Sequence, residues 1–251
     1  MNSILINAAT PRELAYLVRE LSATPTPFPG GEVWRGLLAS GNTEVTLATT
    51  GIGKVNTAWA LTALLERYLD RPPALIINTG CGGAYSGSGL SVGDLAVANC
   101  EIYGDDGVVT PKGWSSMEEI GIPVMVRKDK LYFNEFPLSQ TAAEMAMRLA
   151  TVLNIPMQRG RFVTVSTCSG TSTQGSELIR RHNGICENME GAVVAHLALK
   201  YNIPCMEVRG ISNMVEDRDL SRWNISAAVD AAQRFLLRFL EGIEHSLGRV
   251  L

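Results

Sequence analysis

Short apolar segments alternate along this chain with longer segments of helical period, and this alternation is the feature that most constrains the fold. Apolar runs predict strands at 3–9, 32–40, 43–50, 74–80, 94–102, 160–169 and 203–212. Apolar residues at helical spacing predict helices at 11–21, 53–69, 141–153, 189–201 and 225–243. Strands that alternate with helices in this way are typical of α/β domains. The apolar character of 74–80 and 204–208 also predicts central strands that are buried on both faces.

Proline and glycine mark several element ends. Pro11 suits the first turn of the helix at 11–21, and Gly41–Asn42 suits a tight turn between two strands of a hairpin. The segment 25–31 is expected to be a loop. The helix at 53–69 is expected to be strongly amphipathic and to end before the prolines that follow it.

The chain has 251 residues, a length that one α/β domain can fill. We find no internal repeat, low-complexity segment or linker in it. The stretch 104–137 is irregular, and a loop of that length is usually functional or disordered. We therefore expect residues 1–251 to form a single domain.

The composition excludes several classes of protein. The sequence is 46% hydrophobic and 19% charged with a net charge of −3, so nothing favours nucleic acid or an anionic membrane as a partner. Five scattered cysteines without a C-x-x-C pair and three dispersed histidines argue against a disulfide framework or a metal site. No segment has the apolar length of a membrane span, and the N-terminus has the pattern of a first strand. We expect a cytoplasmic protein that needs no cofactor. The composition does not exclude a small molecule as its ligand.

Two glycine-rich turns follow predicted strands, at 49–56 (TTGIGKVN) and 78–85 (NTGCGGAY). At the start of a helix, such a turn exposes free N–H groups, which favour an anion together with the helix dipole. Neither turn has the spacing of the dinucleotide fingerprint or of a P-loop. Taken singly, both turns are better explained by tight packing of backbone segments.

Acidic residues near predicted helix starts are ambiguous when each is taken alone. Glu13 follows the first strand, where an exposed helix glutamate is the default interpretation. Glu190 begins a predicted helix, and an acid in the first turn gains about 0.3–1 kcal/mol from the helix dipole. Glu187 could already fill that role, and a carboxylate beside a buried surface needs partners such as the hydroxyls of a ligand. The segment 180–188 is interpreted as a solvated helix end.

The predicted strand at 203–212 ends in a way that a core strand does not require. Its apolar run gives way to Arg209, Gly210, Ser212 and Asn213, and then to the charged segment EDRDLSRW. A strand that only had to stop needs no more than one glycine or asparagine. Polar groups at this position indicate a binding site, to which the glycine turns and the ambiguous acids can contribute.

Taken in order, these segments resemble a known family. The series AATPREL, TTGIGKVN, INTGCGGAY with VGDLAVA, NMEGAVVAH and VRGISN is similar to the motif order of the purine nucleoside phosphorylases and nucleosidases, nearly from end to end. The resemblance implies an α/β three-layer sandwich with a central mixed, partly barrel-like sheet flanked by helices, in a homodimer or larger homo-oligomer. It implies cleavage of an N-glycosidic bond through an oxocarbenium-like sugar. The segment VRGISNMVEDRDLSRW looks most similar to the branch that hydrolyses futalosine, a nucleoside of menaquinone biosynthesis.

The resemblance also implies roles for individual residues. Glu13 matches the acid that activates a water, and Arg209 and Cys81 lie near where the family holds that water. Glu190 matches the carboxylate that binds the ribose hydroxyls. The other matched positions contact the nucleoside: Met189 under the sugar, Gly170 and Thr171 at the base, and Trp223 near the bound nucleoside.

Asn213 departs from the adenine-cleaving nucleosidases, which have an aspartic acid at the matching position. An amide cannot protonate the leaving base, but it can donate to N7 or O6 and accept from N1–H. This favours hypoxanthine, although asparagine also pairs with the N6 and N7 edge of adenine. Glu13 at the attacking face would repel phosphate, which favours water as the nucleophile. A methylthioadenosine/S-adenosylhomocysteine nucleosidase, a 6-oxopurine phosphorylase and a non-catalytic nucleoside-binding protein remain alternatives.

Overall fold

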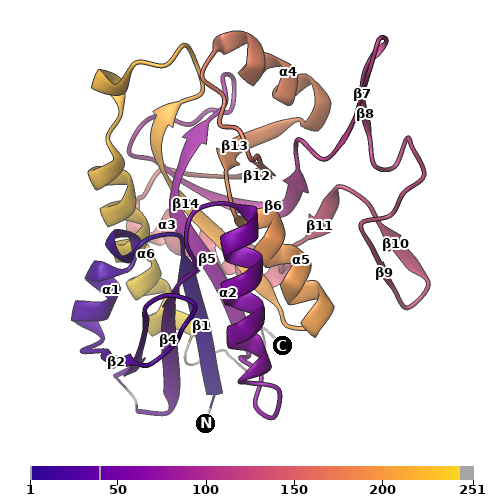
Figure 1. Cartoon of the computed structure of the whole chain (residues 1–251). Coiled ribbons are helices and arrows are strands. Elements are labelled where there is room, and N and C mark those ends of the chain that lie inside the picture. Colours follow the sequence, from indigo (N-terminus) through magenta and orange to yellow (C-terminus); the bar gives the residue numbers. More distant parts are fainter. Residues whose placement is uncertain (1, 40, 244–251) are drawn as a thin grey trace.

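A computed structural model of the chain describes residues 2–39 and 41–243, and its centre is a ten-stranded mixed sheet (Figure 1). In chain order, the strands of this sheet are β1 (Asn2–Ala8), β2 (Thr24–Thr26), β3 (Val33–Leu37), β4 (Thr43–Thr49), β5 (Leu75–Ala84), β6 (Leu95–Tyr103), β11 (Glu135–Pro137), β12 (Met157–Thr164), β13 (Gly184–Asn188) and β14 (Cys205–Met214). Their order across the sheet is β11-β6-β12-β13-β5-β1-β4-β3-β2, and β14 pairs with both β5 and β6. The predicted α/β class is confirmed.

Five of these strands close into a ring. β14 runs parallel to β5 along its length and antiparallel to β6 at 208–210. The pairs β6–β12, β12–β13 and β13–β5 complete the ring. β5 and β14 are buried along almost their whole length, as their apolar sequences predict. The predicted partly barrel-like sheet is therefore confirmed.

Helices flank the sheet on both sides (Figure 1). One core lies under α1 (Ala15–Glu20), α3 (Gln140–Leu153) and α6 (Ile225–Ile243). A second core lies under α2 (Lys54–Glu66) and α5 (Gly191–Tyr201), which pack against each other. α4 (Ser172–His182) contacts β12 and β13. The arrangement agrees with the predicted layers of helices around a sheet.

Three local predictions were wrong. The segment 11–21 forms a 3-10 turn, η1 (Pro11–Glu13), and then α1, with the non-helical Leu14 (φ −122°) between them. The segment 25–31 is not entirely a loop, because its first residues complete β2. The segment 180–188 is not a solvated helix end: Asn183 adopts a left-handed conformation that ends α4, and the buried strand β13 follows.

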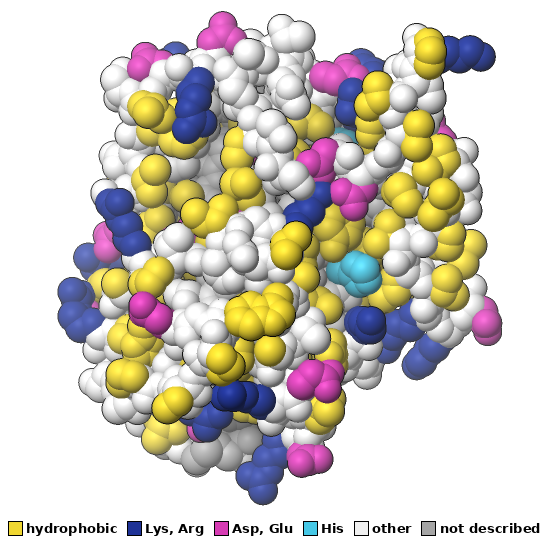
Figure 2. Space-filling model, in the orientation of Figure 1, with side chains coloured by type: hydrophobic (Ala, Val, Ile, Leu, Met, Phe, Trp, Pro, Cys, Tyr) yellow, Lys and Arg dark blue, Asp and Glu magenta, His cyan; other side chains and the backbone are white. Residues whose placement is uncertain are grey.

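α2 lies where a helix was predicted, but it is not strongly amphipathic. Its inward side packs Leu61, Leu64 and Leu65 into the second core. Its outward side carries Val55 and Trp59, which are 81% and 57% exposed. Figure 2 shows hydrophobic side chains spread over the face of the molecule on which α2 lies. The apolar residues of this helix therefore point outward as well as inward.

The irregular stretch 104–137 is ordered around two hairpins that project from the body of the molecule (Figure 1). They are β7 (Gly107–Thr110) with β8 (Gly113–Ser116), and β9 (Met125–Arg127) with β10 (Lys130–Tyr132). Asn134 joins this stretch to β6, since its Nδ2 donates to the carbonyls of Tyr103 and Asp106 (2.8 Å each). The stretch is also attached to α2, because Lys54 at the start of α2 forms ion pairs with Asp105 and Asp106.

Candidate active site

Glu13 ends the η1 turn and is buried, so the default interpretation as an exposed helix glutamate was wrong. Its Oε2 accepts hydrogen bonds from the backbone N–H and the Oγ1 of Thr10, both at 2.9 Å. Its Oε1 accepts one from the N–H of Cys81 at 3.2 Å. This reciprocal cap with Thr10 fixes the carboxylate and directs Oε1 toward the second glycine-rich turn.

Gly80 allows two distant segments to converge at that turn. Its φ of +146° lies in the region that favours glycine. A methyl group at this position would overlap Oε1 of Glu13 and lie 2.9 Å from Nη1 of Arg209. Nη1 also donates to the carbonyl of Cys81 at 3.1 Å. The missing side chain therefore lets a carboxylate from η1 and a guanidinium from β14 approach one point.

Glu190 joins the same cluster. It is the residue before α5, but its side chain does not cap that helix. Instead, its Oε1 accepts from the N–H of Gly53 at 3.0 Å and its Oε2 accepts from Nη2 of Arg209 at 3.4 Å. The first glycine-rich turn thus presents an N–H group to a carboxylate. Burial raises the pKa of Glu190, and the charge of Arg209 opposes that shift.

Arg209 is the cation at the centre of this cluster and is 2% exposed. Its Nε donates to Oε1 of Glu207 at 2.7 Å. Burial disfavours its charge, but the carboxylates of Glu207, Glu190 and Glu13 outweigh burial and raise the pKa of Arg209 above its ordinary value. The guanidinium is therefore charged and held in place by partners on several sides.

Two carboxyl groups lie next to each other behind Arg209. Glu101 and Glu207 are both 0% exposed, and a Cβ at Gly191 would lie 2.1 Å from Oε1 of Glu101 and 2.4 Å from Oε2 of Glu207. Burial, followed by the neighbouring charge of Glu207, raises the pKa of Glu101 well above its ordinary value. Two adjacent carboxylates do not both ionise in such a place, so this pair holds one proton between them. Glu101 also accepts from Thr164 Oγ1 (2.8 Å) and Asn188 Nδ2 (2.6 Å).

Asn213 lies beside an irregularity in the pairing of β14 with β5. Its Oδ1 accepts from Ser212 Oγ at 2.8 Å, and its Nδ2 donates to the carbonyl of Met214 at 3.0 Å. A side-chain amide has two N–H groups and two lone pairs on its oxygen. The side chain of Asn213 therefore has one donor and one acceptor position left for a ligand.

Glu187 is a buried acid near this region to which the sequence assigned no site role. Its Oε1 accepts from the N–H of Ser169 at 2.8 Å. Its Oε2 accepts from Ser169 Oγ at 2.6 Å and from the hydroxyl of Tyr85 at 3.1 Å. Burial raises the pKa of Glu187, and these hydrogen bonds oppose that shift. The apolar residues just before it, in GICEN, were the available signal of a strand.

The predicted base-contacting segment lies next to α4. Thr171 is the N-cap of α4, and its Oγ1 accepts from the N–H of Gln174 at 3.2 Å. The carbonyl of Gly170 accepts from the N–H of Arg218 at 3.2 Å. The guanidinium carbon of Arg218 lies 4.6 Å from the ring centroid of Trp223. Gly170 and Trp223 are therefore linked through one arginine.

Two further predicted residues border the cluster. The N–H of Cys81 contacts Glu13, and burial raises the pKa of the Cys81 thiol to about 11, so the thiol is protonated near neutral pH. Met189 is half-buried immediately before Glu190. The structure thus brings Glu13, Cys81, Glu190 and Arg209 together by direct contacts.

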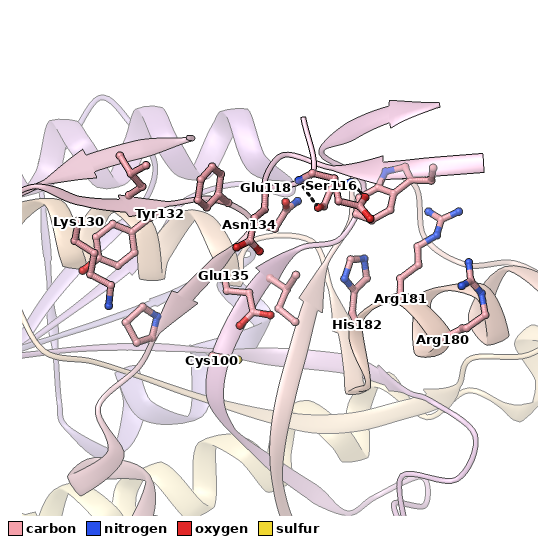
Figure 3. A pocket seen from close by; sticks show the side chains of 16 residues that line it. Cys100, Ser116, Glu118, Lys130, Tyr132, Asn134, Glu135, Arg180, Arg181 and His182 are labelled. Atoms are coloured by element: carbon pink, nitrogen blue, oxygen red, sulfur yellow. Dashed lines mark hydrogen bonds between the residues drawn. The ribbon is translucent and has the colours of Figure 1, made fainter. Parts of the chain in front are cut away.

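A cavity of about 710 Å³ lies elsewhere, between the 104–137 stretch, β6 and the end of α4 (Figure 3). Its lining includes Trp114, Tyr132, Glu135, Arg181 and His182. The guanidinium carbon of Arg181 lies 4.8 Å from the ring centroid of Trp114. No predicted site residue lines this cavity.

Within residues 2–39 and 41–243, no group of three or more His, Cys, Asp and Glu side chains is arranged to hold a metal ion. The helices of the same residues include none with the length and apolarity needed to cross a membrane.

Comparison of this chain with known proteins identifies its family. The profile described as the phosphorylase superfamily matches residues 3–241. Futalosine hydrolase from Thermus thermophilus is 32% identical over 231 residues, which cover 90% of this chain and 95% of that protein. Futalosine hydrolase from Streptomyces coelicolor is 33% identical over 220 residues, covering 85% and 86%. The solved 5'-methylthioadenosine/S-adenosylhomocysteine nucleosidase of S. pneumoniae is 27% identical, with a TM-score of 0.80 over 96% of this chain and 99% of that one. The chain therefore belongs to the phosphorylase superfamily.

Proposed function

We propose that this protein hydrolyses the N-glycosidic bond of futalosine, releasing hypoxanthine and leaving dehypoxanthine futalosine in menaquinone biosynthesis. The observation that supports it best is the contact cluster of Glu13, Arg209 and Glu190, in a chain 32–33% identical to two futalosine hydrolases over most of its length. Water and one small nucleoside are the only partners that this reaction needs.

Glu13 is proposed as the group that accepts a proton from the attacking water. A positioned general base contributes about 10²–10⁴-fold to such a reaction. The hydrogen bonds from Thr10 and Cys81 keep the Glu13 carboxylate in one orientation. Arg209, whose Nη1 reaches the same turn, orients the water and the carboxylate. The thiol of Cys81 is protonated near neutral pH and does not compete as a base.

Glu190 is proposed to bind the ribose hydroxyls. It is buried at the start of α5 with a raised pKa, and a carboxylate in such a place gains from hydroxyl donors. Its negative charge also stabilises the positive charge that develops on the sugar. Met189, directly before it, is proposed to pack under the ribose.

The base is proposed to lie against Asn213, with the backbone of Gly170 and Thr171 beside it and Trp223 at its edge. Asn213 donates a hydrogen bond to N7 or O6 as the leaving group takes up charge. Hypoxanthine requires less help from protonation than adenine does, so an amide is sufficient at this position.

Hydrolysis is favoured over phosphorolysis by the charge of the cluster. Four carboxyl groups (Glu13, Glu101, Glu190 and Glu207) surround a single buried cation, Arg209. A phosphate at the attacking face would need several donors and cations. At the attacking face of this cluster, a phosphate would meet carboxylates, which repel it. A water can bind beside the same carboxylates.

The test is a chromatographic assay of the purified protein with futalosine, inosine and methylthioadenosine, each with and without phosphate. We expect hypoxanthine from futalosine at a rate that phosphate does not change. Adenine from methylthioadenosine would favour the nucleosidase alternative, and release only with phosphate would favour a phosphorylase. No release from any substrate would favour a nucleoside-binding protein.

The same protein is proposed to act as a homodimer or larger homo-oligomer through the outward face of α2. Val55 and Trp59 form an apolar surface there, and such surfaces mark interaction sites. We expect Val55→Asp to reduce the mass measured by light scattering to that of a monomer. Val152→Asp on α3 is the matched control, because Val152 is 80% exposed and lies on a different helix. A monomeric wild-type protein would contradict this proposal.

We further propose one domain and a cytoplasmic location. A single sheet draws strands from residue 2 to residue 214, which supports one folding unit. All five cysteines lie in the described part of the chain and are free thiols, which fits a reducing compartment.

A further inference from the structure

The backbone of Glu190, the proposed ribose-binding residue, is held by a side chain from β13. Asn188 lies at the end of β13, and its Oδ1 accepts hydrogen bonds from the N–H of Glu190 at 3.0 Å and from the N–H of Gly191 at 2.7 Å. Asn188 is buried, so both bonds lie inside the protein. The start of α5 is therefore fixed from within and not by the side chain of Glu190 itself.

The same side chain leads back to the buried acid pair. Nδ2 of Asn188 donates to Oε1 of Glu101 at 2.6 Å. Oε2 of Glu101 accepts from Thr164 Oγ1 at 2.8 Å, and that Oγ1 accepts in turn from the N–H of Ala192 at 2.7 Å. Glu101 is thus connected to the first turn of α5 through two separate side chains.

The carboxylate of Glu190 is connected to the acid pair by a second route. Nη2 of Arg209 donates to Oε2 of Glu190 at 3.4 Å, and Nε of Arg209 donates to Oε1 of Glu207 at 2.7 Å. Because Glu207 lies next to Glu101, the two routes form a closed ring of polar groups. Its members are at most 5% exposed: Glu101, Asn188, Glu190, Glu207 and Arg209. A buried network of this kind holds its members rigidly.

Gly191 gives the acid pair its place beside α5. Glycine is a poor helix former, yet it is the first residue of this helix. A Cβ at this position would overlap Oε1 of Glu101 and Oε2 of Glu207, and the three atoms nearest to it all belong to these two carboxyl groups. The missing side chain therefore lets the pair lie directly against the residue that follows Glu190.

We propose that the buried pair of Glu101 and Glu207 positions Glu190 and thereby sets a preference for a ribonucleoside over a 2'-deoxynucleoside. The inference rests on the proposed function, in which Glu190 binds the ribose hydroxyls. The two routes fix both the backbone and the carboxylate of Glu190, so its oxygens meet those hydroxyls in one geometry. A displacement of about 1 Å in such an arrangement can cost about 100-fold in rate. A substrate without the 2'-hydroxyl makes fewer of these hydrogen bonds and loses less when the geometry changes.

The test compares wild type and Gly191→Ala with futalosine and with its 2'-deoxy analogue. The new methyl group displaces the acid pair, so kcat/KM should fall by about 100-fold for futalosine and by about tenfold for the analogue. The ratio of the two values then falls about tenfold. Equal losses for the two substrates would overturn the proposal, because Gly191 would then only support the fold.

Gly242→Ala is the matched control for this substitution. Gly242 is also a helical glycine, in α6, and a Cβ there would lie within 4 Å of no atom from another described segment. The ratio of kcat/KM for the two substrates in this variant should be that of wild type.

A second comparison does not depend on the folding of Gly191→Ala. Thr164→Val removes the hydroxyl between Glu101 and α5, and the loss of one hydrogen bond should lower the ratio by about fivefold. Thr164→Ser keeps the hydroxyl, so its ratio should stay closer to that of wild type. Equal ratios in these two variants would overturn the proposal.

Failure of the proposed function is a separate result. The wild-type protein itself would then release no hypoxanthine from futalosine, which would remove the proposed function and this inference together. Hydrolysis by wild type with a ratio that none of these substitutions changes would remove the inference alone.

Discussion

Replacing Glu207 by glutamine tests the buried acid pair behind Arg209. In the wild-type protein, Oε2 of Glu207 is buried without a hydrogen-bond partner among the described residues, and Oε1 of Glu101 lies beside it, so we infer that the two carboxyl groups share one proton. In Glu207→Gln, the amide oxygen still accepts from Nε of Arg209, and the amide N–H₂ donates to Glu101. The shared proton is then unnecessary, while the charge of the pair stays the same.

The expected effect is on the pH dependence of stability. The raised pKa of Glu101 means that the folded wild-type protein keeps a proton that the unfolded chain releases above about pH 4.3. Because the folded state binds more protons, the free energy of unfolding falls as pH rises from that value toward the folded pKa. One proton held in this way changes the free energy of unfolding by at most about 1.4 kcal/mol per pH unit, between the ordinary pKa of a glutamate and the raised pKa of Glu101. Glu207→Gln should lack this loss.

The assay is urea unfolding of both proteins at several pH values, followed by circular dichroism. His182 and His196, whose pKa values burial lowers, add a slope of the opposite sign, but they do so equally in both proteins. The quantity that matters is the difference in unfolding free energy, variant minus wild type, which should rise as the pH is raised above about 4.3, by at most about 1.4 kcal/mol per pH unit. Glu144→Gln, an exposed control, should show no such trend. A difference that is constant with pH would refute the shared proton.

Three further substitutions test the site. Gly80→Ala should lower kcat for futalosine by about 100-fold, because its methyl group displaces Glu13 and Arg209; unchanged steady-state kinetics would contradict that contact. Asn213→Asp should raise kcat/KM for 6-amino relative to 6-oxo nucleosides by about tenfold or more, since a carboxylic acid can protonate N7; an unaltered ratio would remove the base-reading role. Glu190→Ala should lower kcat/KM for futalosine by about 100-fold or more. A 2'-deoxy analogue should lose less, because it lacks a hydroxyl for this carboxylate, and equal losses for the two substrates would argue against ribose binding.

Much of the fold follows from local patterns in the sequence. The apolar runs that become β5 and β14 are long enough to indicate central strands, and Gly41–Asn42 marks the β3–β4 turn. The exceptions have local causes. Leu14 separates η1 from α1, and the left-handed Asn183 ends α4 early enough for β13 to form.

The candidate site was predictable only in part. Glu13, Arg209 and Glu190 were found through the order of motifs, and the structure brings them into contact. Glu101 and Glu207 escaped notice because they lie on β6 and β14, and only closure of the ring makes them neighbours. No spacing in the sequence encodes a contact of that kind.

Glu187 escaped notice for a related reason. In the sequence it precedes Met189 and Glu190, so it resembled an acid at a helix start. Its actual neighbours, Ser169 and Tyr85, come from other segments and meet it only once β13 pairs with β5. The outward apolar face of α2 posed the converse problem, since an exposed apolar residue and a buried one look alike in a sequence.

The most direct test of the central claim is the initial rate of hypoxanthine release from futalosine in phosphate-free buffer, measured for wild type and Glu13→Gln. The wild-type protein should release hypoxanthine, and the variant should be slower by about 10²–10⁴-fold with its melting temperature little changed. Equal rates would show that Glu13 does not activate the water. A wild-type protein that releases hypoxanthine only after phosphate is added would contradict hydrolysis itself.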